Sequence, residues 1–545
     1  MNKPARCSIY FLLLFSVCLL HDAGLAAEGH AIPVDCRFRM PVEKDSDEFV
    51  VVNERQTWNT EQTAVIVCDM WDAHWCRGAS LRVAELAPAV DHFISLAREM
   101  GLLIVHAPSD VVDAYKDHPA RRRALEAPPA SDLPDGIDQW CRWLDECERE
   151  NWPVDPASKG CDCQPRCEAP DGPPWPWRGQ IETIRIDDQD AVSASGSEIW
   201  NLFAQRGIRN VILVGVHTNM CVAGRPFGLR NMARFGKNVV LCRDLTDTMY
   251  DSRTRPFVNH FSGTDLVVEH IEKFICPTIL STALTGEPPF RFRQDRRSRV
   301  VMLSAESEYE ANRTLARLAN ELTVRYGLGC EILQGSTEKR GEGRNHIPYM
   351  AALKGADLAV LFVRRRALPP EQMQSLRNYL QHGGPLVAFR TSSHAFALRG
   401  EVASGLQQWP EFDREVLGCR YDGYPHGETR VRIAPGAEQH AILKGLDGPY
   451  QIRETMYRSA PLEPSCRVLL TGSCVDGPGD DPRYRLDPEK ETPDQPVAWI
   501  NEYRNGRIFY TSLGSGRASF EQPWFQRMVV NAVFWALDRP VPEAR

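Results

Sequence analysis

Several residues that can take part in nucleophilic or acid–base chemistry follow directly after apolar runs that are predicted to be strands. Asp69 follows the run 64–68, His106 follows 102–105, and the segment His217-Thr218-Asn219-Met220-Cys221 follows 211–216. In an open α/β sheet, reactive groups gather where parallel strands end, at the carboxyl edge. We therefore expect Asp69 and Cys221 to face one site.

Nucleophilic hydrolysis is the chemistry that this pair would support. Cys221 is predicted to begin a helix, where free N–H groups and the helix dipole favour the thiolate and lower the pKa of the thiol. The same N–H groups can receive a developing oxyanion. Asp69 could accept the thiol proton and return it to a leaving group. A structural interpretation stays open, in which Cys221 is a small buried residue and Asp69 caps a turn.

The elements that must position these residues alternate between strands and helices. Further elements of the first half are helices at 83–100, 197–206 and 222–235 and a strand at 239–241. The alternation restarts with strands at 300–303, 358–363 and 386–389 and helices at 309–326 and 370–382. Strands that are apolar on both faces and separated by helices imply a parallel sheet covered on both sides. We therefore expect an α/β protein of two domains, each a mostly parallel doubly wound sheet with helices on both faces.

The chain has 545 residues, which is too long for a single core. The segment 288–298 is the clearest linker, because two prolines are followed there by arginines and little apolar content. The expected organisation is a signal peptide at 1–27, a first domain at 28–287 with a Cys-rich insertion at about 140–178, this linker, and a second domain at 299–545.

The first 27 residues have the composition of a secretory leader. Lys3 and Arg6 precede a mostly apolar run from Ile9 to Leu20, and small residues follow up to Ala27. This order is typical of a cleaved signal peptide, and the apolar run is short for a membrane span. A retained N-terminal anchor is the alternative. We expect an exported protein, periplasmic or extracellular, without membrane association beyond the cleaved signal.

The formal net charge of -8 is modest and provides no basic surface for nucleic acid. A small-molecule substrate is the expected partner, nucleic acid is not, no cofactor is expected, and homo-oligomerisation is left open.

Five of the 17 cysteines lie close together in the insertion: Cys141, Cys147, Cys161, Cys163 and Cys167. In an oxidising compartment we expect at least one disulfide among them. A Cys-x-Cys pair with a third cysteine could hold zinc instead, and free thiols are the third alternative.

Two segments resemble the isochorismatase-like cysteine hydrolases. They are Thr63–Asp72, an apolar strand leading to an Asp-Met pair, and Val211–Met232, which contains the Thr-Asn-Met-Cys turn. The resemblance covers about Thr63 to Ile279. It implies a doubly wound sheet, an Asp-Lys-Cys triad with Asp69 and Cys221 as catalytic residues, and a non-proline cis peptide at His217–Thr218. It also implies cleavage of C–N bonds in nicotinamide, carbamoyl compounds and related amides, or of the vinyl ether of isochorismate.

The lysine of that triad has no counterpart where the resemblance implies it. Ile184–Asp190 has acidic residues there, and Arg178, Arg225 or Lys116 could supply the cation instead. The histidine pattern of metal-dependent nicotinamidases is not evident, so no catalytic metal is expected. The residues expected to bind substrate are His217, Thr218, Asn219, Arg225 and His106.

Three segments of the second half resemble, in the same order, the trehalose-utilisation-type (ThuA-like) domain, a relative of class I glutamine amidotransferases. They are Leu386–Phe396, His440–Leu446 and Pro496–Leu513. Where amidotransferases have a nucleophilic cysteine, this chain has Arg390-Thr391-Ser392-Ser393-His394, and Ser515 follows Gly514 where many ThuA-like domains have a histidine. Ser393 and His394 are neighbours on a turn, where side chains rarely point at one another. We therefore expect a non-catalytic binding domain, with a carbohydrate as its candidate ligand.

Together these features predict an exported isochorismatase-like cysteine hydrolase that acts on a small amide-like compound. The alternative is a non-catalytic, carbohydrate-binding protein built on two degenerate enzyme folds.

Overall fold

The computed structural model describes residues 31–543, apart from 45, 339–341, 426 and 476–491. The expected signal peptide at 1–27 therefore lies outside the described residues. The chain forms two compact units with the boundary between Arg296 and Arg297, inside the expected linker 288–298. Within the described part of the chain, no helix has the length and apolar character needed to cross a membrane.

The first unit is an eight-stranded sheet. Its strands in spatial order are β2 (Phe49–Asn59), β1 (Ala31–Pro41), β8 (Thr278–Ile279), β7 (Asn238–Asp247), β6 (Asn210–Val216), β3 (Thr63–Cys68), β4 (Leu103–Ala107) and β5 (Ala191–Val192). The six strands from β8 to β5 are parallel, whereas β1 and β2 form an antiparallel hairpin at one edge. The central strand β3 is buried along its whole length, which explains its unbroken apolar sequence.

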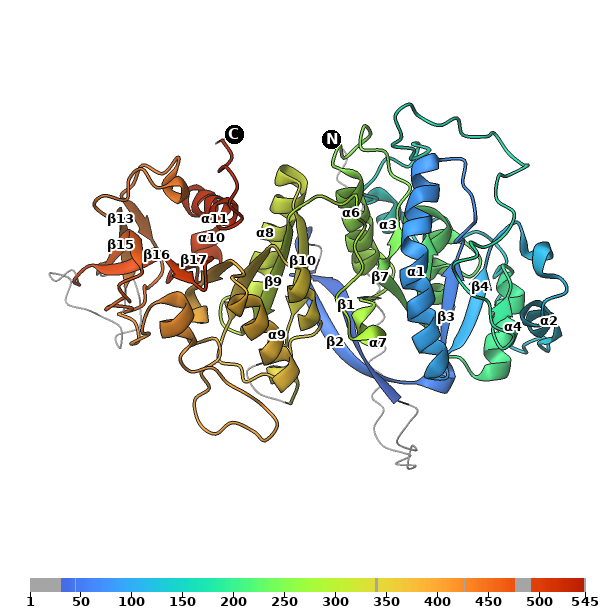
Figure 1. Cartoon of the computed structure of the whole chain (residues 1–545), viewed down its shortest axis with the longest axis horizontal. Coiled ribbons are helices and arrows are strands. Elements are labelled where there is room, and N and C mark those ends of the chain that lie inside the picture. Colours follow the sequence, from blue (N-terminus) through green and yellow to red (C-terminus); the bar gives the residue numbers. More distant parts are fainter. Residues whose placement is uncertain (1–30, 45, 339–341, 426, 476–491, 544–545) are drawn as a thin grey trace. The chain divides into compact units, whose positions relative to one another are not determined.

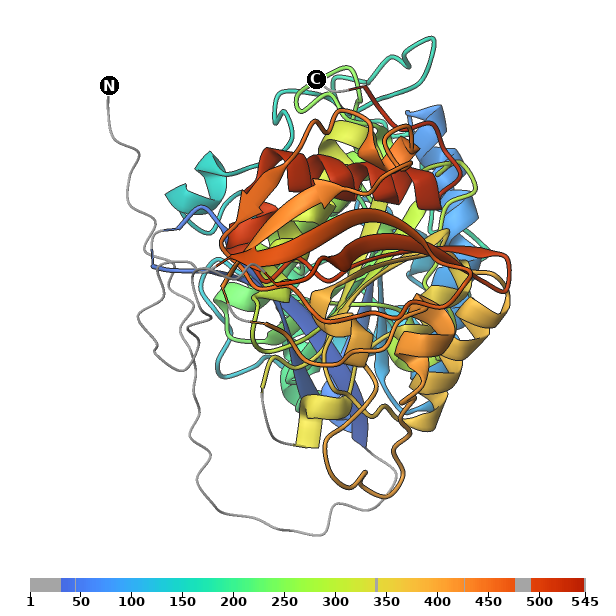
Figure 2. The same ribbon diagram turned by 90° about the vertical axis from the view of Figure 1, so that its left-hand side faces the viewer.

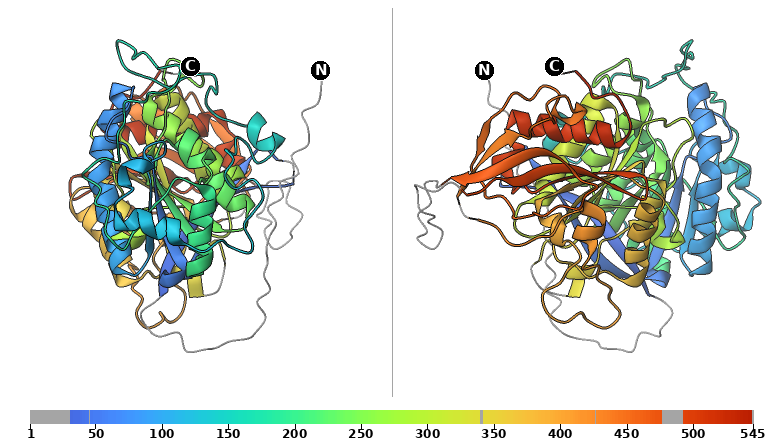
Figure 3. Two further views of the ribbon diagram at one scale, coloured as in Figure 1. Left: turned by 90° about the vertical axis from the view of Figure 1, so that its right-hand side faces the viewer. Right: turned by 60° about the vertical axis from the view of Figure 1, so that its left-hand side comes forward.

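Helices cover both faces of this sheet (Figure 1; Figure 3, left). Helices α1 (Arg77–Glu99) and α7 (Thr282–Thr285) pack on one face, against Val65, Val67 and Ile212 among others. Helices α4 (Gly196–Arg206), α5 (Leu229–Arg234) and α6 (His260–Phe274) pack on the opposite face. The remaining helices are α2 (Pro119–Glu126) and α3 (Glu146–Glu150).

The helix expected at 222–235 is interrupted. Thr218–Val222 forms a wide helical turn, and α5 begins only at Leu229. Pro226 has no N–H and disfavours helical backbone at Arg225 before it, so a tight turn replaces the continuous helix, with the Gly228 N–H donating to the Arg225 carbonyl at 2.7 Å.

The second unit is a nine-stranded sheet. Five neighbouring strands are parallel: β10 (Gly329–Gln334), β9 (Arg299–Ala305), β11 (Leu358–Val363), β12 (Leu386–Phe389) and β17 (Gly506–Thr511). The other four continue the sheet in antiparallel pairing: β16 (Gln495–Tyr503), β15 (Arg467–Val475), β13 (Glu428–Ile433) and β14 (Tyr450–Ile452). The expected α/β fold class is confirmed for both units, and this second sheet is mixed.

Two long helices lie on one face of the second sheet, because Tyr326 of α8 (Ala311–Tyr326) packs edge-on against Phe534 of α11 (Pro523–Ala536). Helix α9 (Pro370–Gln381) lies across the sheet from α11 (Figure 2). The short helix α10 (Arg517–Phe520) precedes α11.

The disulfide expected in the insertion is absent. Cys141, Cys161, Cys163 and Cys167 all have free thiols, so no bridge joins two of the insertion's five cysteines.

Candidate functional site

Asp69 lies at the end of β3, at the carboxyl edge of the sheet. Its backbone has a φ of 47° and its N–H donates to the carbonyl of Ala107 on the neighbouring strand at 3.1 Å. The side chain is fully buried, and its Oδ1 accepts a hydrogen bond from the Ser109 N–H at 2.8 Å. This bond orients the buried carboxylate, and its second oxygen, Oδ2, lies 3.4 Å from Arg225 Nε.

The Asp69 carboxylate lies close enough to the Cys221 thiol for its charge to act on it. Cys221 is 8% exposed and belongs to the turn Thr218–Val222, not to the start of a long helix. Burial and, after it, the negative charge of Asp69 raise the pKa of the thiol, whereas Arg225 opposes them. The expected lowering of this pKa by a helix terminus is therefore wrong: at rest, Cys221 is a neutral thiol.

Arg225 supplies the cation of this site. Its Nε lies 3.4 Å from Asp69 Oδ2, and its other end pairs with Asp110 at 3.2 Å. The guanidinium also interacts with Cys221 and lies 5.1 Å from the centre of the Trp140 ring. Burial alone would lower the pKa of Arg225, but the negative charges of Asp69 and Asp110 outweigh it and raise this pKa, so Arg225 stays protonated.

Of the three residues that the sequence offered as this cation, the structure places one at Asp69 and two on the surface. Arg225 contacts Asp69, while Arg178 and Lys116 are both exposed on the surface. The acidic stretch where a lysine was implied is used elsewhere: Asp190 pairs with Arg98 at 2.8 Å and hydrogen-bonds to His106 Nε2 at 3.1 Å.

His106 is not brought to the Cys221 thiol by any contact among the described residues. It is fully buried, and its two ring nitrogens face Gln180 Oε1 at 3.0 Å and Asp190. This geometry makes His106 a structural partner of the segment that follows the insertion. Its expected contact with substrate has no support in these bonds.

Thr218 and Asn219 fix the turn that presents Cys221. The Thr218 hydroxyl bonds to that of Thr246 at 2.7 Å. The Asn219 amide donates to the Met249 carbonyl at 2.9 Å and accepts from its N–H at 3.0 Å. Both residues therefore attach the turn to the segment that ends β7 and follows it.

His217 lies at the start of this turn with 2% exposure, and burial lowers its pKa far below the usual value, so the ring is neutral. Its Nε2 has no hydrogen-bond partner within the described structure. The non-proline cis peptide is at Val216–His217, one residue earlier than the resemblance implied.

Aromatic residues from two separate loops lie beside this site, and the sequence analysis did not identify them. Trp71 stacks on Trp177 with ring centres 4.2 Å apart, and Trp177 stacks in turn on Trp175 at 5.1 Å. His74 lies between Trp177 at 5.7 Å and His217 at 5.0 Å. Trp71, Trp177 and Cys221 belong to one buried cluster. The only sequence signal for these contacts was the tryptophan content of the insertion.

In the second unit, Arg390 occupies the turn after β12 where amidotransferases have their nucleophile. Its guanidinium donates to the Ser512 carbonyl at 3.1 Å and the Thr455 hydroxyl at 2.8 Å and lies 4.4 Å from the Tyr457 ring centre. The neighbouring side chains Ser393 and His394 do contact each other, at 3.2 Å, contrary to our expectation. Burial and nearby arginines lower the pKa of His394 to about 2.

Comparison with known proteins supports one part of this picture directly. Residues 343–536 match the family model for ThuA, trehalose utilisation, which confirms the ThuA-like domain of the second unit. Comparison with curated proteins finds no match.

Solved structures offer weaker likenesses. A putative ThuA-like protein from Bacteroides uniformis is 18% identical, with 46% of this chain and 94% of that chain covered and a TM-score of 0.32. One from Parabacteroides merdae is 16% identical, with 46% and 93% covered and a TM-score of 0.33. An isochorismatase family protein from Burkholderia thailandensis is 13% identical, with 41% and 94% covered and a TM-score of 0.24. At these TM-scores none of the three carries an argument, and the isochorismatase-like assignment of the first unit stays a prediction.

Proposed function

We propose that the first unit is a cysteine hydrolase that cleaves the C–N bond of a small amide-like compound. One observation carries the proposal: a carboxylate, a thiol and a guanidinium converge at the carboxyl edge of the sheet, all from residues that the chain brings together from separate segments. A buried ion pair is costly to form and is retained most readily where chemistry needs it.

The reaction follows from the proximity of the Asp69 carboxylate to the Cys221 thiol. Asp69 takes the thiol proton as the Cys221 sulfur attacks the carbonyl carbon, giving a tetrahedral oxyanion. The C–N bond then breaks, Asp69 gives the proton to the leaving nitrogen, and a thioester forms. Water, deprotonated by Asp69, attacks the thioester, releasing the acid and restoring the thiol. Arg225 stabilises the carboxylate before transfer and the anionic centre during it.

The surroundings of the site support a small substrate. Trp140 is 42% exposed and its ring centre lies 5.1 Å from the Arg225 guanidinium, so it offers a flat apolar surface suited to a planar amide. The leader-like composition of residues 1–27 supports action outside the cytoplasm.

We also propose that the second unit binds a ligand without catalysing a reaction. His394 lies 4.4 Å from Tyr421 and 5.8 Å from Tyr457, measured between ring centres, and Tyr424 is 42% exposed beside them. Aromatic faces next to arginine donors are suited to a sugar, and trehalose is the first probe because of the family match. Loss of trehalose binding in Tyr424→Ala, measured by calorimetry, would support the assignment.

The test of the first-unit proposal is ammonia release by the full-length protein from nicotinamide and from simple carbamoyl compounds. We expect turnover of at least one of them and a loss of about 1,000-fold or more in Cys221→Ser. Cys466→Ser is the matched control, because this thiol lies in the second unit and is half-buried. A trapped thioester on Cys221, seen by intact mass spectrometry, would identify the intermediate.

A binding protein on two degenerate folds is the alternative, favoured by the raised pKa of Cys221 and by Arg390 at the lost nucleophile position. It predicts that amides raise the melting temperature of wild type and Cys221→Ser equally, without ammonia release from either.

A further inference from the structure

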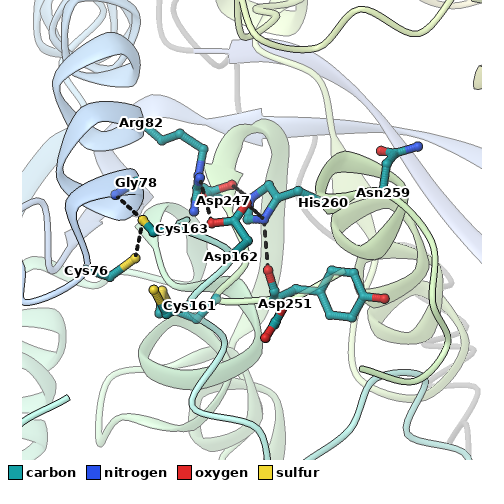
Figure 4. Close-up of polar contacts among 12 residues, drawn as sticks. Cys76, Gly78, Arg82, Cys161, Asp162, Cys163, Asp247, Asp251, Asn259 and His260 are labelled. Carbon is teal, nitrogen blue, oxygen red and sulfur yellow. Dashed lines mark hydrogen bonds and ion pairs between the residues drawn. The ribbon is translucent and has the colours of Figure 1, made fainter. Parts of the chain in front are cut away.

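Four cysteines that are distant in the sequence converge in the first unit. Cys76 precedes α1, whereas Cys161, Cys163 and Cys167 come from the insertion. Figure 4 shows Cys76, Cys161 and Cys163 side by side. Their sulfur atoms all lie within 4.8 Å of one another, and the Cys76 and Cys163 sulfurs are 3.7 Å apart. In a tetrahedral zinc site with Zn–S bonds of about 2.3 Å, the sulfurs are about 3.8 Å apart. The four side chains therefore already have nearly the required spacing.

Backbone N–H groups point at three of these sulfurs. The Gly78 N–H donates to Cys163 Sγ at 3.1 Å, Arg77 to Cys167 Sγ at 3.4 Å, and Cys167 to Cys161 Sγ at 3.4 Å. Such bonds orient metal-bound thiolates and disperse their charge. Gly78 is suited to this position, because a Cβ there would lie 3.2 Å from Cys163 Sγ.

Charged side chains flank the cluster and hold the backbone that carries two of its cysteines. Arg253 donates to the Cys161 carbonyl at 2.9 Å, and Arg82 pairs with Asp162 at 3.5 Å (Figure 4). Asp162 also pairs with His260 at 3.3 Å, and both Arg82 and His260 bond to the buried Asp247 at 2.8 and 2.9 Å. The backbone between Cys161 and Cys163 is thus held by a hydrogen bond at Cys161 and by ion pairs at Asp162.

We propose that Cys76, Cys161, Cys163 and Cys167 bind one zinc ion in a closed, structural site. Four protein ligands leave no open position for substrate, unlike a catalytic zinc site. The spacing suits a single ion rather than an iron–sulfur cluster, whose ligand sulfurs surround several metal atoms. The site is separate from the Asp69–Cys221–Arg225 group and does not depend on its activity.

The ion would attach the insertion to the loop that follows Asp69. Cys76 ends that loop, which also contains Trp71 and His74. Cys161 packs against Met249, whose backbone holds Asn219 in the Cys221 turn. A metal-bound cluster would therefore fix both the tryptophan-bearing insertion and the turn of Cys221, since the insertion has few regular elements of its own.

The first test is metal content and coordination in the full-length protein purified without chelator. We expect about one zinc per chain by plasma mass spectrometry. After removal of zinc and addition of Co²⁺, we expect the visible bands of tetrahedral cobalt with strong thiolate-to-metal charge transfer. Loading with neither zinc nor cobalt, together with peptide mapping that finds disulfides among these four cysteines, would overturn the proposal.

Cys163→Ser and Cys167→Ser should each lower zinc content at least tenfold, whereas Cys141→Ser, in the same insertion but outside the cluster, should leave it unchanged. Equal zinc in all three variants would refute the assignment. If the variants do not fold, titration of wild type with a mercurial should release one zinc per four modified thiols, seen with a colorimetric chelator. Release that does not track these four thiols, identified by mass spectrometry, contradicts the site.

Discussion

At the scale of single residues, the site differs from the sequence expectation in how its thiol is activated. The expected cause was a helix terminus, but Cys221 is buried in a wide turn beside Asp69, and both burial and that carboxylate raise its pKa. The thiolate must then form together with proton transfer to Asp69. Arg225, one of three candidates for the missing lysine, contacts Asp69 and begins the tight turn that contains Pro226.

Arg225 should be needed for activity more than for folding. We expect Arg225→Gln to lower kcat/KM by about 100-fold or more, since Asp69 and the oxyanion lose their cation. Arg225→Lys should lose less, because it restores the charge. Arg178→Gln is the matched control, as this side chain is exposed. Steady-state kinetics of ammonia release measure all three, and a harmless Arg225→Gln would remove Arg225 from the mechanism.

The rate of alkylation of Cys221 tests how the Asp69 carboxylate affects the pKa of the Cys221 thiol. Burial raises the pKa of the Cys221 thiol most, and the negative charge of Asp69 raises it further. Asp69→Asn should therefore increase the rate of iodoacetamide labelling at Cys221 at one fixed pH, although it abolishes turnover. Peptide mass spectrometry over a time course gives the rate, with Cys466 as the internal reference. Slower labelling in Asp69→Asn would mean that Asp69 acts as an activating base in the resting protein.

At the scale of elements, the strands that carry the candidate residues were predictable and the insertion contacts were not. Runs such as 64–68 and 211–216 are apolar on both faces, and the strands β3 and β6 follow them closely. The stacking of Trp71 on Trp177 joins residues from two irregular loops, for which no period in the sequence exists. The position of Cys76 was also not predictable, because Cys76 is distant in the sequence from the three insertion cysteines that the fold brings next to it.

Close packing of β6 against β3 makes Gly215 a sensitive position. Its φ is +103°, and a Cβ there would lie 2.1 Å from the Cys68 carbonyl oxygen. We expect Gly215→Ala to lower the free energy of unfolding by more than about 3 kcal/mol or to prevent folding. Gly207→Ala is the control, because Gly207 also has a positive φ but nothing within 4 Å, so only about 1 kcal/mol should be lost. Urea unfolding followed by tryptophan fluorescence compares the two, and similar losses would contradict the packing argument.

At the scale of the whole molecule, the fold class and the ThuA-like second domain could be predicted, whereas the edges of both sheets could not. The antiparallel strands β13 to β16 and the hairpin of β1 and β2 are half-exposed, so they lack the continuous apolar runs that identify central strands. The hairpin is fixed to the first unit by buried apolar side chains such as Val34 and Trp58 and also by charge. Arg37 and Arg39 of β1 pair with Glu272 of α6 at 2.7 and 3.1 Å, and Arg39 also pairs with Glu269 at 3.3 Å.

Because of these ion pairs, the free energy of unfolding should depend on pH in the acid range. Burial alone would raise the pKa of Glu269, but Arg39 and Lys273 outweigh it and lower the pKa from 4.5 to about 2. The stabilisation is therefore present above pH 4.5 and is lost as the pH falls toward 2. Near neutral pH, Glu269→Gln should lower the free energy of unfolding by up to about 3 kcal/mol, and this difference from wild type should shrink steadily below pH 4.5. Glu287→Gln, at an exposed position, should change little at any pH. Urea unfolding at a series of pH values measures the difference, and a gap that stays constant down to the acid limit would show that Glu269 acts through packing and not through its charge.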